Sequence, residues 1–158
     1  MKRCPFPIET VLLHAHPMIL LDDIVGYDET SLTSALTIRP ETKFFRPGRG
    51  VAAHIGLEWM AQTCGAFAGA RAREWGEEVR LGLLLGTRDF SADVTWFPEG
   101  ERLHVTATQL FVDGRIGAFD CAILRAGGTL PAARAQLTVY QPPDVAALLA
   151  DRASQATS

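Results

Sequence analysis

The chain has 158 residues, of which 47% are hydrophobic and 21% are charged, and its formal net charge is -3. This length fits one domain with a sizeable core, and the slightly acidic balance without a basic block argues against a nucleic-acid partner. No apolar run is long enough to span a bilayer and no signal-peptide pattern follows the N-terminus, so we expect a cytoplasmic protein without a membrane span. The three cysteines, Cys4, Cys64 and Cys121, lack metal-ligand spacing, which favours reduced thiols, with Cys64 and Cys121 acting as small buried hydrophobes.

The first fifty residues predict two strands and a loop. An apolar run over residues 18–27 predicts a buried strand. Residues 32–38 alternate between two faces and predict a second strand, which Pro40 ends. Residues 44–50 contain Pro47-Gly48 and a second glycine, which are typical of a loop.

One long helix is predicted from Val51 to Glu74. It is unusually rich in Ala and Gly, and each glycine lowers intrinsic helix stability by up to about 1 kcal/mol relative to Ala. Such a helix needs tertiary packing to form. Because it is apolar nearly all round until Arg71, we expect it to be buried on most faces, with a sheet wrapped closely around its small side chains.

The second half of the chain predicts an antiparallel meander. Asp113-Gly114 is a strong two-residue hairpin signal between two alternating segments. The predicted strands cover residues 81–96, 103–109, 116–124 and 130–140. Two strands, a helix and a meander form an α+β pattern. We expect one domain over residues 1–143, followed within residues 144–158 by a short C-terminal helix over 144–152 and a disordered tail over 154–158.

Polar residues within the predicted helix fall at His54, Glu58 and Gln62. Their i, i+4, i+8 spacing puts all three on one helix face. A buried carboxylate needs a partner or takes a raised pKa, and a carboxyl in an apolar cleft beside an imidazole suits proton transfer. The spacing equally fits a structural Glu–His pair at a helix contact, because such pairs also perturb pKa values.

Five segments, taken together, resemble segments of a known family. The segment Gly56-Leu57-Glu58-Trp59-Met60-Ala61-Gln62 resembles the central-helix signature of hotdog-fold 3-hydroxyacyl-acyl carrier protein dehydratases. Residues 13–22, LHAHPMILLD, resemble that family's opening stretch, LLPHRPPMLLLD. Phe44-Phe45 and the segments 84–88 and 97–101 also match. The likeness covers about residues 11–141, and within the family the chain most resembles the ApeP-like dehydratases of aryl-polyene lipid clusters.

The resemblance implies a hotdog fold, in which an antiparallel sheet wraps around a long central helix, and a dimer with sites at the subunit interface. It implies a dehydratase that removes water from a 3-hydroxyacyl thioester without a cofactor or metal, with Glu58 as a catalytic residue. Gly86 and Gln62 are expected to bind substrate. The expected partners are an acyl carrier protein, met by Arg46, Arg49 and Arg88, and either a second copy of this chain or another hotdog dehydratase.

One departure from the family concerns the catalytic histidine. The common dehydratases carry it in the loop before the helix, in an His-Phe-Pro-Gly context, whereas residues 45–50 here read FRPGRG. His54 is then the nearest imidazole. Either His54 is the base, which we favour, or the protein has lost full dehydratase activity. Among the other histidines, we expect His14 to be structural, and His16 and His104 to be solvated.

Two other functions remain compatible with these residues. A hotdog thioesterase would use the same glutamate to activate water on the thioester carbonyl. Alternatively, a non-catalytic hotdog subunit would support an active dehydratase without turnover of its own. Product analysis distinguishes a thioesterase from a dehydratase, since hydrolysis releases a free thiol and dehydration gives an enoyl thioester.

Overall fold

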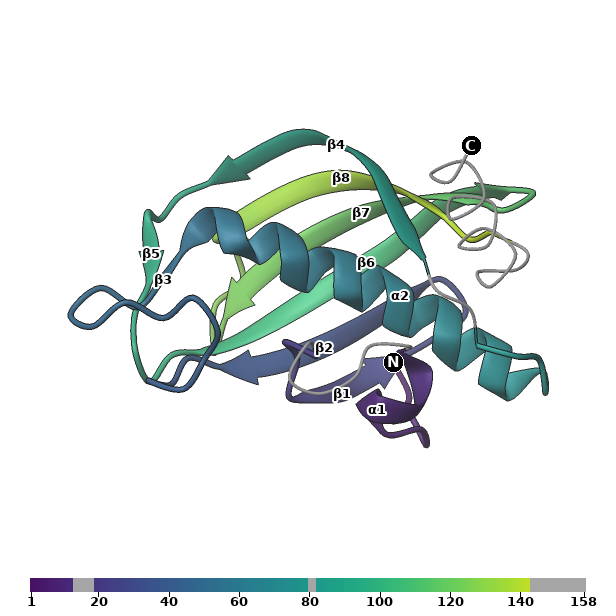
Figure 1. Cartoon of the computed structure of the whole chain (residues 1–158), viewed down its shortest axis with the longest axis horizontal. Coiled ribbons are helices and arrows are strands. Elements are labelled where there is room, and N and C mark those ends of the chain that lie inside the picture. The colour runs from purple at the N-terminus through teal and green to yellow at the C-terminus, as the bar shows by residue number, and fades with distance from the viewer. Residues whose placement is uncertain (13–18, 80–81, 143–158) are drawn as a thin grey trace, which may run out of the picture.

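The computed structural model describes residues 1–12, 19–79 and 82–142. Across these residues a six-stranded antiparallel sheet wraps around one long helix, as predicted (Figure 1). The strand order is β1-β2-β6-β7-β8-β4, and a separate two-stranded sheet joins β3 to β5. The elements are α1 (Ile8–Val11), β1 (Asp23–Tyr27), β2 (Ser31–Thr37), β3 (Val51–Ala52), the 3-10 helix η1 (Ala53–Ile55), α2 (Gly56–Glu74), β4 (Leu83–Ala92), β5 (Trp96–Phe97), β6 (Arg102–Asp113), β7 (Ile116–Arg125) and β8 (Ala133–Tyr140).

The central helix begins later than its apolar pattern predicts. α2 starts at Gly56, not at Val51, and ends at Glu74 as predicted. The residues before it form the short strand β3, which pairs with β5, and one 3-10 turn. Pairing with a strand far along the chain overrides the local preference of these residues, so the predicted helix start was wrong.

Most other elements agree with the sequence pattern. The hairpin between β6 and β7 forms where Asp113-Gly114 predicts one, but it turns one residue later, at Gly114 and Arg115, because Asp113 still pairs with Ile116; Gly114 has a φ of 60°. The first strand begins only at Asp23, and the run over residues 81–96 divides into β4 and β5. Residues 13–18 and the predicted helix over 144–152 lie outside the described residues.

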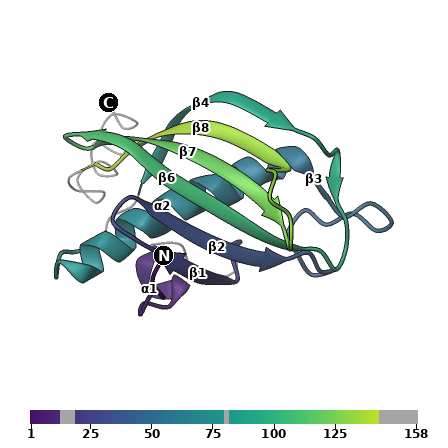
Figure 2. The same cartoon turned by 180° about the vertical axis from the view of Figure 1, so that it is seen from behind.

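Small residues let α2 lie very close to its neighbours. A Cβ atom on Gly56 would stand 2.5 Å from the Cδ1 atom of Ile123, and one on Gly69 would collide with the carbonyl group of Val11. The buried sheet residues that face the helix alternate with more exposed outward ones in β7 and β8, and in β8 the exposed outward residues Arg134 and Gln136 are polar. The face of the sheet opposite α2 is seen in Figure 2.

A buried polar contact fixes the helix against β2. The hydroxyls of Ser34 and Thr63 lie 2.8 Å apart, and both side chains are fully buried. Thr63 Oγ1 also donates a hydrogen bond to the Trp59 carbonyl, at 2.7 Å. Since a buried hydroxyl without a partner costs free energy, this contact favours one position of α2 on the sheet.

Replacing Gly69 with alanine tests the close approach between α2 and α1. We expect Gly69→Ala to lower the free energy of unfolding by about 1–3 kcal/mol, the usual cost of overpacking, despite the better helix propensity of alanine. Chemical denaturation measures the change. Gly65→Ala is the matched control, because its new methyl would meet only the flexible end of Leu12, at 3.2 Å. Equal losses in both variants would contradict the assigned cause.

Candidate active site

The first turns of the helix carry two of the predicted site residues. His54 lies in the 3-10 turn η1 and Glu58 in the first turn of α2. Because a 3-10 turn has about three residues, His54 does not continue the α-helical spacing that the sequence predicted. The two residues nevertheless lie on adjacent turns, and no side chain caps the start of α2.

Both side chains are exposed in the single chain. The expectation that Glu58 and His54 are buried was therefore wrong for one chain alone. The sheet covers the face of α2 that carries Trp59, Met60 and Phe67, and it leaves the face of Glu58 open. No hydrogen bond or ion pair joins His54 to Glu58, although both belong to the described residues. The proposed structural Glu–His pair is thus not formed within this chain.

Gln62 lies one turn beyond Glu58 and is buried. Its Oε1 atom accepts a hydrogen bond from the backbone N–H of Leu20, at 2.8 Å. This amide therefore joins α2 to the segment that leads into β1, a contact that sequence reasoning missed because it spans 42 residues. A substrate-binding role for Gln62 stays a prediction.

The stretch that carries His14 and His16 lies outside the described residues, but its two flanks are fixed on the helix. On one side the end of Leu12 lies close to Gly65, and on the other Leu20 bonds to Gln62. The expectations for His14 and His16 stay predictions. His104 is described, half-buried on the face of β6 that points away from α2.

Gly86 lies apart from Glu58 in the single chain. It is exposed on β4, the last strand of the sheet, where it pairs with Thr138 of β8. β4 begins beside the C-terminal half of α2 and runs back toward the other end (Figure 1), whereas Glu58 lies in the first turn. Within one chain the structure brings His54, Glu58 and Gln62 together, but not Gly86.

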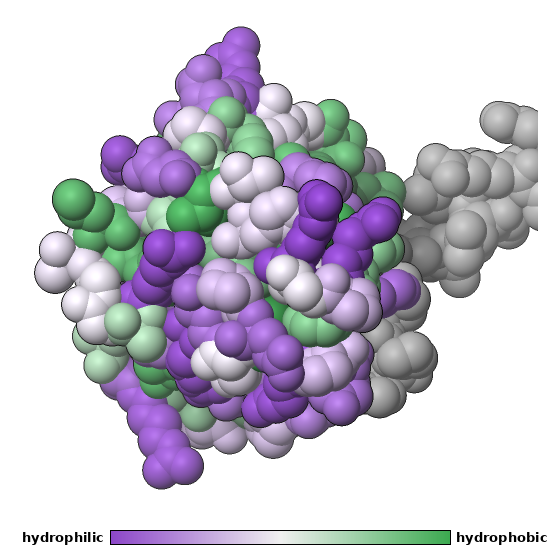
Figure 3. Space-filling model, turned by 90° about the vertical axis from the view of Figure 1, so that its left-hand side faces the viewer, coloured by the Kyte–Doolittle hydropathy of each residue, from purple (hydrophilic) through white to green (hydrophobic). Residues whose placement is uncertain are grey.

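The loop before β3 projects from the same end of the molecule as the helix start (Figure 1). Its tip is closed by two backbone hydrogen bonds between Arg46 and Gly50, at 2.8 and 2.9 Å. Arg46 and Arg49 are exposed, and the Arg49 guanidinium lies 5.5 Å from the centre of the Trp96 ring. Seen from this end, hydrophilic side chains project between smaller apolar patches (Figure 3).

A pocket of about 490 Å³ lies beside this loop. Its lining combines apolar side chains, such as Leu20 and Trp59, with charged side chains of both signs: Arg39, Lys43, Asp22 and Glu41. Trp59 follows Glu58 directly in α2, so the pocket adjoins the helix turn that carries the candidate carboxylate. Sequence reasoning did not identify this pocket, because its walls come from separate segments.

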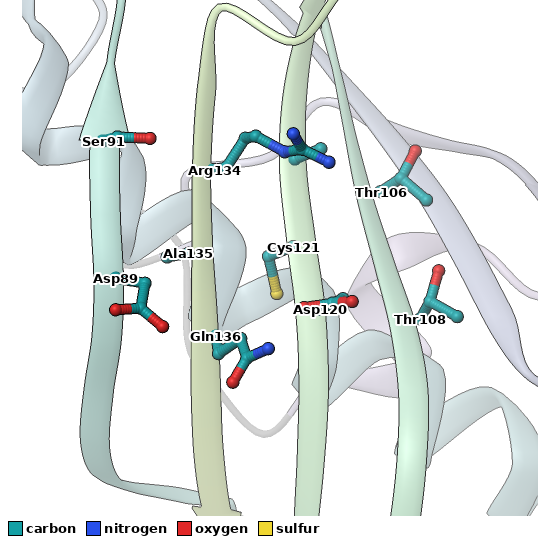
Figure 4. Close-up of a pocket in the computed structure, with 10 residues that line it drawn as sticks. Asp89, Ser91, Thr106, Thr108, Asp120, Cys121, Arg134, Ala135 and Gln136 are labelled. Atoms are coloured by element: carbon teal, nitrogen blue, oxygen red, sulfur yellow. The ribbon is translucent and has the colours of Figure 1, made fainter.

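A second hollow lies on the outer face of the sheet, away from α2. It has a volume of about 440 Å³, and its polar lining comes from four strands (Figure 4). Asp89 and Ser91 lie on β4, and Arg134 and Gln136 on β8, with further polar residues on β7 and β6. None of the predicted site residues lines it.

Neither a metal centre nor a membrane helix is found in the described part of the chain. Across residues 1–12, 19–79 and 82–142, no group of three or more His, Cys, Asp or Glu side chains is arranged to hold a metal ion. In the same residues no helix is long and apolar enough to cross a membrane.

Comparisons with known proteins agree with this architecture. The dehydratase heterocomplex ApeI:P from Xenorhabdus doucetiae contains a chain that is 26% identical, with a TM-score of 0.83 over 91% of this chain and 95% of that one. The PaaI protein of the phenylacetic acid degradation operon of E. coli has 12% identity and a TM-score of 0.59, over 75% of this chain and 81% of its own.

A hypothetical thioesterase with coenzyme A from Streptococcus pneumoniae shares the fold at 9% identity, with a TM-score of 0.60 over 76% of this chain and 84% of that one. No curated protein matches the sequence. The sequence model of the ApeP dehydratase family, described as ApeP-like, matches residues 6–150. The chain therefore belongs to the ApeP-like dehydratase family.

Proposed function

We propose that this dehydratase removes water from a 3-hydroxyacyl thioester carried on an acyl carrier protein and forms the 2-enoyl thioester. The proposal depends on one observation: in a chain of the ApeP-like dehydratase family, the acidic residue Glu58 lies in the first turn of α2. The positive end of the helix dipole favours a carboxylate there. The open face around Glu58 leaves room for a substrate between this chain and a second one.

The reaction needs one base and one acid. In the proposed mechanism His54 removes a proton from C2 of the substrate, and Glu58 protonates the C3 hydroxyl, directly or through a water. The C3–O bond breaks, water leaves, and the electron pair of the broken C2–H bond forms the C2=C3 double bond. A backbone N–H at the start of α2 or near Gly86 polarises the thioester carbonyl. This chemistry uses no cofactor.

The working form is proposed to be a dimer with its sites across the interface. β4 is a ten-residue strand at the end of the sheet, and Leu84 and Leu85 on it are 44% and 57% exposed. An open, apolar strand edge favours pairing with another strand. A second hotdog chain on this edge would cover Glu58 and bring its own Gly86 toward it. That second chain is either another copy or a related dehydratase, as in the ApeI:P heterocomplex.

The carrier protein is proposed to dock near the loop before β3. Arg46 and Arg49 are exposed there, and Arg88 is exposed on β4. Positive side chains around a site favour the approach of an acidic partner.

A second candidate function is that of a subunit that supports a catalytic partner. Two observations favour it: the loop over residues 45–50 has no histidine, and the neighbour from Xenorhabdus doucetiae is a heterocomplex. Under this alternative the chain alone binds the acyl carrier without turnover.

Replacing Glu58 with glutamine tests its role as the acid. The amide keeps the shape of the side chain but cannot protonate a leaving hydroxyl, so we expect a rate loss of roughly 10²–10⁴-fold. Because Glu58 is exposed, the free energy of unfolding should change by less than about 0.5 kcal/mol. Formation of the enoyl thioester from a carrier-bound 3-hydroxyacyl substrate measures the rate. Glu29→Gln, an exposed carboxylate in the turn before β2, is the control. A wild-type rate in Glu58→Gln would refute the catalytic role.

The second prediction concerns His54 as the base. His54→Ala should lower the rate by about a hundredfold or more, because the group that accepts the C2 proton is lost. His54→Asn separates catalysis from hydrogen bonding. Exchange of the C2 hydrogen with deuterium should disappear in His54→Asn and persist in the control His104→Asn. Persistent exchange in His54→Asn would exclude His54 as the base.

The third prediction concerns the oligomeric state. Sedimentation at micromolar concentration should give twice the 17.2 kDa chain mass. Leu85→Lys should weaken the dimer, because it adds a charge to the open edge of β4. Leu130→Lys changes a side chain that is 82% exposed and lies outside the strands, and it should leave the dimer intact. A clean wild-type monomer would contradict a site across the interface.

A further inference from the structure

Two buried cysteines meet between the helix and the sheet. Cys64 of α2 and Cys121 of β7 are 57 residues apart in sequence, and their sulfur atoms lie 3.5 Å apart. Their exposed fractions are 0% and 4%, and both are free thiols. From the sequence we expected two separate small hydrophobic residues, because nothing in their spacing indicates that they touch.

The surroundings allow the two sulfurs to approach further. Cys121 points toward α2 from the middle of β7, and its neighbours on β6 and β8 are Ala107 and Ala135. These small side chains restrict the rotation of the sulfur less than larger neighbours would. A disulfide bond is about 2.05 Å long, so the sulfurs need to move closer by about 1.5 Å, which side-chain rotation and a slight shift of α2 can supply.

We propose that Cys64 and Cys121 form a modification site, in which oxidation by a small peroxide produces an intramolecular disulfide that locks α2 to β7. Hydrogen peroxide first oxidises the Cys64 thiolate to a sulfenic acid as its O–O bond breaks, and one water is released. The Cys121 sulfur then attacks the sulfenic sulfur and expels a second water. In sum, two S–H bonds break, one S–S bond forms, and the two electrons and two protons of the thiols reduce one peroxide to two waters.

A small cavity borders Cys64. This residue lines a cavity of about 60 Å³ between α2, β8 and the β6–β7 hairpin. About 10–15 Å³ is enough for one water, so the cavity can hold a peroxide but not a bulky disulfide reagent. Ala68, Gln109 and Val112 also line a larger neighbouring groove of about 740 Å³ at the surface. The site should therefore select oxidants by size.

Burial also determines how fast the site reacts. Loss of solvent raises the pKa of the Cys64 thiol well above its usual value, and the hydrogen bond with Cys121 raises it further. Since the thiolate is the reactive form, oxidation should be slow at neutral pH and faster as the pH rises. The proposal does not depend on the dehydratase mechanism, and its outcome leaves the roles of His54 and Glu58 untouched.

The experiment uses the full chain with Cys4→Ser, which removes the remaining thiol. After treatment with hydrogen peroxide, the folded protein is denatured and alkylated, and its intact mass is measured. We expect a loss of two hydrogens, no alkylation, and a peptide that links Cys64 to Cys121. The link should raise the Tm by about 10 °C, as expected for a long closed loop. The rate should rise up to about tenfold per pH unit between about pH 7 and 9.

Two controls distinguish a specific link between Cys64 and Cys121 from non-specific oxidation. Cys121→Ala should stop at the sulfenic acid on Cys64, which dimedone added together with the denaturant traps. Oxidised glutathione should form the link at least about tenfold more slowly than an equal concentration of peroxide, because it does not fit the cavity. Sulfinic acid on Cys64 without a link, or a link that forms only in denaturant, would overturn the proposal. Equal rates for the two oxidants would overturn the route through the cavity.

Discussion

The close packing of α2 on the curved sheet is the constraint on which the rest of the molecule depends. A glycine-rich helix has little intrinsic stability, so contacts with the sheet and with α1 must hold it in place. Gly56 against Ile123 and Gly69 against Val11 set the depth of the helix, and the Ser34–Thr63 contact sets its position along the sheet. These contacts therefore determine the position of every candidate functional group on α2.

Local patterns in the sequence were sufficient to predict most of the fold. The alternation over residues 32–38, the hairpin between β6 and β7 and the end of the helix at Glu74 were confirmed, because each depends on neighbouring residues, although the hairpin turns one residue later than predicted. The start of the helix was predicted wrongly, since β3 forms through pairing with β5, far along the chain. Contacts between distant segments, such as Gln62 with Leu20 and Cys64 with Cys121, left no signal in the sequence.

The candidate site was predicted in part. His54 and Glu58 lie on adjacent turns, although His54 belongs to a 3-10 turn and not to the predicted α-helix, and the prediction that they are buried was wrong for one chain. An apolar sequence around a residue does not decide which face of its helix the sheet covers. In the proposed dimer the surroundings of this face depend on a second chain, whose identity a single sequence does not contain.

The two-residue pairing of β3 with β5 has a consequence for how this family can vary. It joins the end of the projecting loop to a distant part of the chain immediately before the helix begins. Insertions or deletions within the loop are therefore absorbed before Val51 and do not propagate into α2. Loop length, and the side chains that the loop offers, can change in evolution while Glu58 keeps its position. A dehydratase scaffold can in this way lose or exchange a loop histidine without rebuilding its central helix.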